Sequence, residues 1–353
     1  MNIFDYIKYY GDYTFDTKPF NEIDNVVLSM ISYVNFEGIV TDKEITLEEA
    51  YSIFKIKYDP KKKEMFAVKK GIKTFELAKE QNRYRDIKLS NYSYVGDEKS
   101  QFSAITFNLF DNNYYVAFRG TDELVSGWEE DFKMSYHFPV KAQVLAKNYL
   151  DKNFTTKRCK LIVGGHSKGG NLALVSSMYA NYFVKKKIIK IYSNDGQGLR
   201  KAQLESSYYK KIEDKYIHII PNYSVVGLIL WHKDNYTIVK SNKKGVQAHD
   251  ATTWQVSYDH FEKENLSRFS KVFDDGFTKW LDTYTDEDRK VFVKGIFNIL
   301  KDNGIVNLVD IKIKKDLIIN VLNSSKDINP LVKEMTMELI KIINKTNFEY
   351  SLF

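Results

Sequence analysis

The sequence predicts an α/β protein with a mostly parallel sheet, helices on both faces of the sheet and a helical C-terminal subdomain. Three observations lead to this fold class. From residue 102 onward, short apolar runs alternate with amphipathic runs, which favours parallel strands joined by helices. The segment 161–173, LIVGGHSKGGNLA, passes from an apolar run through glycines into good helix formers. After Trp254, apolar residues recur only at helical spacing.

Length and charge limit the class of protein. The 353 residues suffice for a packed core, expected at 1–254 with a mixed lead segment, and a helical subdomain at 255–353 that packs on it. The net charge of +7 is modest for this length. Nucleic acid is therefore not an expected partner, whereas weak contact with an anionic membrane surface agrees with this charge.

The expected cellular compartment follows from two kinds of segment that the sequence lacks. The N-terminal residues contain no apolar signal core, and no stretch approaches about 18 uninterrupted apolar residues. The expected location is therefore cytoplasmic. The single cysteine, Cys159, excludes an internal disulfide and is expected in a strand.

Helix signals dominate the lead segment. Apolar residues in 20–33 lie at helical spacing, with Asn21 as the N-cap, and Thr46 stands at the same position before LEEAYSIF. The lysine-rich run 55–73 is expected to be a solvated face or loop. The alternative is a surface that faces phospholipid head groups.

Strand signals begin near residue 103. Asp111, Asn112 and Asn113 separate two strand-like runs, which predicts a hairpin at the antiparallel start of the sheet. The expected strands are 103–110, 114–120, 159–165, 188–193, 215–220 and 235–241. The expected helices are 140–149, 171–184, 269–281, 291–300 and 331–343. Functional residues are expected on loops beyond the carboxyl ends of the parallel strands.

The glycine-rich stretch predicts a nucleophile elbow. Gly165, Ser167 and Gly169 form G-x-S-x-G between an apolar strand and a helix. Small residues are needed there because the serine occupies a sharp, strained turn and the helix passes close to the strand. The alternative is a plain glycine-rich turn. A phosphate-binding loop fits worse, because Lys168 directly follows the serine.

Four motifs in order carry a family resemblance. GHSKGGNLA, together with FRGTDELVSGWEEDF at 118–132, SNDGQG at 193–198 and VKSNKKGVQAHDATTW at 239–254, resembles a bacterial family of α/β hydrolases related to the class 3 lipases. The N-terminal stretches FDYIKYYGDYTF and PFNEIDNVVLSMISY are similar to it as well. The resemblance implies an α/β-hydrolase fold and covers nearly the whole chain. The family has no assigned physiological substrate.

A serine nucleophile needs a base, and His249 is the expected one. A hydroxyl becomes a nucleophile at neutral pH only when an imidazole takes its proton. His249 follows the last expected strand and belongs to the family-like QAHDATTW, which gives the chain order Ser, Asp, His. A hydrogen-bonded loop histidine is the alternative. His166 is expected to point away from Ser167, and His218 to be a strand residue.

Asp195 is the expected acid of this triad. The class 3 lipases usually carry the aspartate after the strand that KYIHII represents, but here that segment continues as PNYSVV, without a carboxylate. Asp195 closes the preceding strand, and some lipases of this fold carry their acid there. A loop-capping role is the alternative for Asp195, and Asp234 and Asp250 are the other candidate acids.

Two backbone N–H groups are expected to hold the oxyanion. One belongs to Lys168, the residue after the nucleophile. The other is assigned to Thr121 by the resemblance of FRGT to the class 3 lipase stretch; a turn residue closing a strand is the alternative. The Lys168 ammonium is expected to pair with Asp122 or Glu123 and so fix the oxyanion loop, the alternative being a solvent-facing lysine.

These residues predict a serine hydrolase, similar to lipases and esterases, that cleaves a carboxylic ester through an acyl-enzyme on Ser167. The expected substrate is a small-molecule or lipid ester. No cofactor is expected, and no metal either, because the sequence has no H-E-x-x-H or paired Cys/His spacing. Two other classes stay open: a catalytically inactive scaffold of this fold, and a peripheral protein that binds a membrane or a partner.

Overall fold

The computed structural model describes residues 1–353 except 62–63, 98–99, 122–124, 234, 305–327 and 352–353. Eight strands lie side by side in chain order, antiparallel from β1 to β4 and parallel from β4 to β8. They are β1 (Ile45–Thr46), β2 (Lys88–Asp97), β3 (Ser100–Asn108), β4 (Asn113–Phe118), β5 (Lys160–His166), β6 (Ile188–Asn194), β7 (Tyr216–Pro221) and β8 (Thr237–Val239). The expected α/β fold with a mostly parallel sheet and an antiparallel start is thereby confirmed.

Alternate residues of the central strands enter two different cores. In β4, Tyr115 and Ala117 belong to one core, while Tyr114 and Val116 belong to the other. Side chains of a strand point to opposite faces in turn, so a run that is apolar throughout requires cover on both sides. The helices supply that cover.

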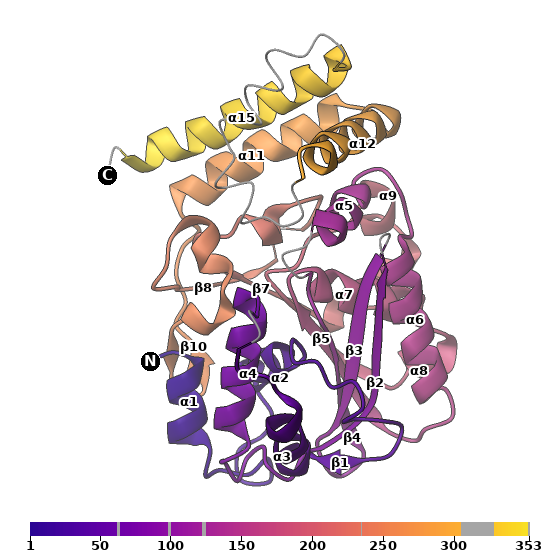
Figure 1. Ribbon diagram of the computed structural model, residues 1–353, viewed down its shortest axis with the longest axis vertical. Coiled ribbons are helices and arrows are strands. Elements are labelled where there is room, and N and C mark those ends of the chain that lie inside the picture. The colour runs from indigo at the N-terminus through magenta and orange to yellow at the C-terminus, as the bar shows by residue number, and fades with distance from the viewer. Residues whose placement is uncertain (62–63, 98–99, 122–124, 234, 305–327, 352–353) are drawn as a thin grey trace.

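Helices lie on both faces of the sheet (Figure 1). The first core is closed by α1 (Ile3–Tyr10), α2 (Glu22–Ile31), α3 (Leu47–Lys57) and α4 (Phe66–Ala78). The second is closed by α6 (Lys141–Phe154) and α7 (Lys168–Tyr179). The other helices before the C-terminal region are α5 (Val125–Lys133), α8 (Tyr182–Lys185), α9 (Lys201–Leu204) and α10 (Ser207–Lys210).

The predicted helix starts at Asn21 and Thr46 are confirmed, because each side chain closes a capping box at the first turn. Other boundaries differ. The helix expected at 171–184 ends at Tyr179 and a separate short helix follows it, while Cys159 lies in a bend just before β5. The short β1 and the long β2 were not predicted. A small hairpin of β9 (Val256–Ser257) and β10 (His260–Phe261) also lies in the region after Trp254 where no strand was expected.

A buried ion pair holds the lead segment together. The Arg83 guanidinium donates to both carboxylate oxygens of Asp24, at 2.8 and 2.5 Å, and also to four main-chain carbonyl groups. Tyr84 adds a third side-chain donor to Asp24, at 2.6 Å. Both charged side chains are fully buried. Such a pair is tolerated inside a protein only when its remaining hydrogen bonds are satisfied, and here it fixes α2 against the rest of the lead segment.

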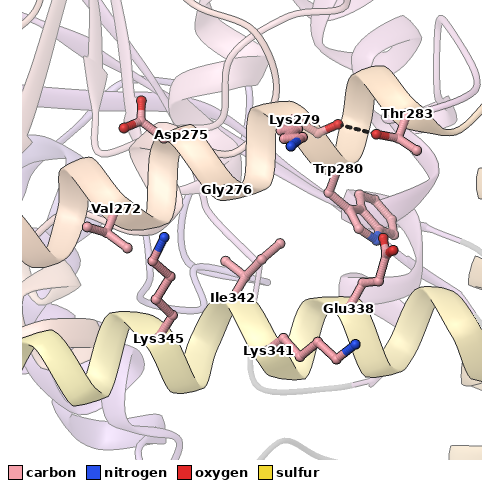
Figure 2. A pocket seen from close by; sticks show the side chains of 10 residues that line it. All are labelled: Val272, Asp275, Gly276, Lys279, Trp280, Thr283, Glu338, Lys341, Ile342 and Lys345. Atoms are coloured by element: carbon pink, nitrogen blue, oxygen red, sulfur yellow. Dashed lines mark hydrogen bonds between the residues drawn. The ribbon is translucent and has the colours of Figure 1, made fainter.

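The C-terminal helices form a separate layer at the top of Figure 1. They are α11 (Arg268–Thr283), α12 (Asp286–Asp302) and α15 (Pro330–Ser351), and their core includes Met134 and Ile220 from the rest of the chain. Figure 2 shows a groove between α11 and α15, where Gly276 lets Ile342 approach closely. Among the described helices, none is long and apolar enough for a transmembrane span.

Candidate active site

Ser167 is the single residue that joins β5 to α7. Its backbone has φ 58° and ψ −134°, in a region that residues with a side chain rarely occupy. Two glycines make this turn possible. A Cβ on Gly169 would lie 2.0 Å from the Phe118 carbonyl oxygen, and a Cβ on Gly165 would lie 2.4 Å from the Gly169 carbonyl carbon. The backbone of the G-x-S-x-G stretch therefore has the geometry of a nucleophile elbow.

Asp195 follows β6, with a positive φ of 49°, and is fully buried. Its Oδ1 accepts hydrogen bonds from Ser224 Oγ at 2.5 Å and from the Gly227 N–H at 3.0 Å. Its Oδ2 lies 2.6 Å from His249 Nδ1. Ser224 and Gly227 come from the segment after β7 where the class 3 lipase pattern would carry the acid. That segment thus supplies donors to a carboxylate on the neighbouring strand.

His249 ends the 3₁₀ helix Gly245–His249, and its side chain is 22% exposed. Because a carboxylate only accepts, the short contact with Asp195 places a proton on Nδ1 and leaves Nε2 as the acceptor of the neutral ring. The ring of His166 is tilted against that of His249 with centroids 4.5 Å apart. His166 directly precedes Ser167, so this contact brings the His249 loop to the serine turn.

Of the three candidate acids, Asp195 is the one that the described residues bring to His249. Asp250 accepts from the N–H and hydroxyl of Thr252 and forms an ion pair with Lys70 at 3.3 Å. Asp234 lies outside the described residues. These contacts occupy the Asp250 carboxylate, which explains why Asp250 does not bond to His249 although it follows His249 in sequence.

Thr121 lies in the loop after β4, directly after a residue that touches the elbow. A Cβ on Gly120 would lie 2.9 Å from Ser167 Cβ and 2.6 Å from the His166 carbonyl oxygen. The Thr121 hydroxyl donates to Asp131 Oδ2 at 2.7 Å. As the first residue of α7, Lys168 has an N–H without an intrahelical acceptor. The donor roles of Thr121 and Lys168 stay predictions.

The Lys168 ammonium has buried partners among the described residues. Its Nζ lies 2.6 Å from Glu130 Oε2 and 3.4 Å from Asp131 Oδ1, both of which are carried by α5. The expected partners, Asp122 and Glu123, lie outside the described residues. The alternative of a solvent-facing lysine is wrong, because the side chain is completely buried.

Glu130 and Asp131 form the core of a buried polar cluster. Glu130 also accepts hydrogen bonds from the Ser100 hydroxyl and from the N–H groups of Gln101 and Ala142. Burial raises the pKa of Asp131 to about 6, although the nearby Lys168 ammonium opposes this shift. The cluster ties the Thr121 loop to the start of α7. A role for Asp131 in bracing this loop agrees with the family resemblance, but its link through Lys168 was not predicted, because no local pattern connects the carboxylates of WEEDF to Lys168.

Lys168→Met is expected to lower the free energy of unfolding by about 3–5 kcal/mol, because it leaves two buried carboxylates without their cation. Equilibrium unfolding in urea measures this loss. The matched control is Lys147→Met, which breaks the more exposed Lys147–Asp151 pair and should cost less than about 1 kcal/mol. Adding Glu130→Gln to Lys168→Met should recover part of the loss. Equal losses of unfolding free energy in Lys168→Met and Lys147→Met would contradict the role assigned to the cluster.

His166 and His218 are both buried and have supporting contacts. Their pKa values fall to about 4, mainly because burial disfavours the charged ring. His218 lies in β7, as predicted, and its Nε2 bonds to the Gly196 carbonyl at 3.1 Å, beside Asp195. His166 Nε2 bonds to the His249 carbonyl at 2.7 Å. The described residues contain no group of three or more His, Cys, Asp or Glu side chains arranged to hold a metal ion.

A family model described as Mbeg1-like matches residues 78–298. No match is found among curated proteins. Similar solved structures include the lipase from Rhizopus microsporus var. chinensis, with 16% identity over 67% of this chain and 88% of that one and a TM-score of 0.34. M37 lipase is 15% identical over 57% of this chain and 68% of that one, with a TM-score of 0.36. The native Rhizomucor miehei lipase propeptide complex is 14% identical over 45% of this chain, with a TM-score of 0.34, and the match spans 58% of that lipase chain.

Proposed function

The chain belongs to the Mbeg1-like family, and from the site that it carries we propose a serine hydrolase that cleaves a carboxylic ester through an acyl-enzyme on Ser167. One observation supports this proposal most: the residue in the strained turn after β5 is a serine, and the nearby His249 ring is bonded to the buried Asp195 at 2.6 Å. A plain glycine-rich turn has no need for either feature.

In the proposed acylation, Ser167 Oγ attacks the carbonyl carbon of the ester while His249 Nε2 takes the hydroxyl proton. Asp195 keeps the other ring proton on Nδ1 and stabilises the imidazolium that forms. The carbonyl oxygen becomes an oxyanion, which accepts from the backbone N–H groups of Lys168 and Thr121. Such donors act on charge that develops in the transition state, and losing one typically costs about 2.7–4 kcal/mol.

Breakdown of the tetrahedral intermediate releases the alcohol. The bond between the carbonyl carbon and the leaving oxygen breaks, and His249 returns its proton to that oxygen. Water then attacks the acyl group on Ser167, with His249 again taking the proton. The second tetrahedral intermediate expels Ser167 Oγ, which regains its proton, and the carboxylic acid leaves. The reaction needs no cofactor, and a small-molecule or lipid ester meets its chemical requirements.

The test uses the folded 353-residue protein and a fluorophosphonate probe, which reacts with activated serines. Labelling should be complete, mass spectrometry should place the adduct on Ser167, and p-nitrophenyl esters of increasing acyl length should be hydrolysed. Heat-denatured protein is the control, because an unfolded chain has no activated serine. If the folded protein neither reacts with the probe nor hydrolyses any ester, it is a catalytically inactive scaffold and the proposal is wrong.

A further inference from the structure

His166 makes two hydrogen bonds, neither of them to Ser167. Its Nε2 lies 2.7 Å from the main-chain carbonyl oxygen of His249, and its Nδ1 lies 2.9 Å from the hydroxyl of Tyr33. His166 is only 5% exposed, and its ring packs on that of His249. His166 therefore contacts both the ring and the main chain of His249, the proposed base.

These contacts allow one arrangement of protons on the neutral ring. A carbonyl oxygen only accepts, so His166 Nε2 must carry a proton. Burial and the neighbouring His249 lower the pKa of His166 to about 4, so the ring is neutral near pH 7. Its Nδ1 is then an acceptor, and the Tyr33 hydroxyl donates to it. The His249 carbonyl thus fixes the tautomer, and the Tyr33 hydroxyl stabilises that neutral form by donating to Nδ1.

A neutral His166 ring favours proton uptake by His249, the proposed base beside it. During acylation His249 becomes an imidazolium, and a second positive ring beside it would oppose that charge. The other groups that face His166 are the carboxylates of Asp195 and Asp250, which favour its charged form. Because the Tyr33 hydroxyl donates a hydrogen bond to Nδ1, it opposes protonation of that nitrogen.

Tyr33 also reaches the other side of the site. A Cβ on Gly120 would lie 2.2 Å from the Tyr33 hydroxyl oxygen, so this hydroxyl touches the loop that leads to Thr121. Tyr33 follows α2, the helix that the buried Arg83–Asp24 pair holds in place. Through the Tyr33 side chain, the lead segment thus contacts both His166, which bonds to the His249 main chain, and the oxyanion loop.

We propose that Tyr33 and His166 are a positioning pair: Tyr33 stabilises the neutral Nε2–H form of His166 by donating to Nδ1, and His166 holds the His249 main chain beside the reacting ring. This inference rests on the proposed serine hydrolase function and extends it to a side chain outside the triad. Neither residue touches the substrate or takes part in proton transfer in this scheme.

The first measurement needs no activity. In the Ser167→Ala variant, nitrogen-15 NMR of labelled histidine should show His166 as the Nε2–H tautomer, unchanged from pH 8 to pH 5.5. In Ser167→Ala with Tyr33→Phe, protonation of the ring should begin at a higher pH than in Ser167→Ala alone, because its hydroxyl donor is gone. An Nδ1–H tautomer in the first protein, or identical titrations in both, would overturn the proposal even if the enzyme is active.

The second measurement is kinetic. Tyr33→Phe and His166→Phe should lower kcat about 10- to 100-fold with less than a threefold change in KM, and the loss should be greater at pH 5.5 than at pH 8 for Tyr33→Phe. His166→Gln, which keeps an N–H donor near the Nε2 position, should recover most of the rate. A purely structural loss would be constant with pH and would not be rescued by glutamine, and that result counts against the pair.

Tyr149→Phe is the matched control, because the Tyr149 hydroxyl is also buried and bonds to Thr106 and the Asn91 carbonyl, but on α6 away from His166. It should lose stability to a similar extent as Tyr33→Phe and keep its kcat. If the unmodified protein has no esterase activity, the proposed function fails while the NMR result still tests the tautomer. If it is active and Tyr33→Phe matches Tyr149→Phe, the positioning pair alone is wrong.

Discussion

Ser167→Ala is expected to lower kcat by about 10⁶-fold and to abolish fluorophosphonate labelling. In serine hydrolases the loss of the nucleophile alone removes nearly all of the triad's contribution, because the other members have no proton to move. The fold should remain intact, since alanine is smaller and the turn geometry at Ser167 arises from its glycine neighbours. Ester turnover by purified protein and the melting temperature measure the two effects.

The control for this variant is Ser177→Ala, on the same helix as the elbow. Its hydroxyl is buried and has no hydrogen-bond partner in the described structure, so removing it should leave turnover unchanged. Residual activity in Ser167→Ala above about one hundredth of the native rate would mean that another residue forms the acyl-enzyme. Equal losses in both variants would point to damage in α7 instead of lost chemistry.

Asp195→Asn is expected to lower kcat by about 10⁴-fold, as in other triads whose histidine is trapped in the wrong tautomer. The contacts of Asp195 give the reason. An asparagine oxygen would stay with its two donors, Ser224 Oγ and the Gly227 N–H, and would turn its NH₂ group toward His249 Nδ1. His249 Nδ1 would then have to accept, and the ring proton would move to Nε2, the nitrogen that has to take the Ser167 proton in the proposed reaction.

Asp250→Asn is the matched control for this second variant. Asp250 is adjacent to His249 in sequence, but its carboxylate contacts Thr252 and Lys70. Its kcat should change by less than tenfold. The pH dependence of kcat/KM should be measured for both variants, because only Asp195→Asn removes the carboxylate that bonds to His249. A small effect at Asp195 and a large effect at Asp250 would falsify the assignment of the acid.

Local patterns were sufficient to predict the serine turn. A strand, two glycines and a helix within a few residues leave little freedom, so the φ of Ser167 follows from short-range packing against Gly165 and Gly169. The helix starts at Asn21 and Thr46 were predicted for the same reason, since a capping box involves residues only three positions apart.

Contacts between distant segments were harder to predict. The sequence left three carboxylates open as partners of His249, and only the packing of β6 beside β7 selects Asp195. The partners of Lys168 depend on how α5 turns after β4, which no periodicity specifies. The sequence indicates only that Tyr33 ends a helical run. Nothing in the neighbouring residues reveals that its hydroxyl reaches His166.

The chain-order arrangement of the strands has a consequence for synthesis on the ribosome. Each new strand can pair with the one made just before it, so the sheet can grow at one edge without rearranging strands already in place. The turn at Ser167 can form as soon as α7 packs on β5, whereas Asp195 and His249 emerge later. In the proposed reaction, a partly made chain therefore has Ser167 without its base, and it gains His249 only when the segment beyond β8 is synthesised.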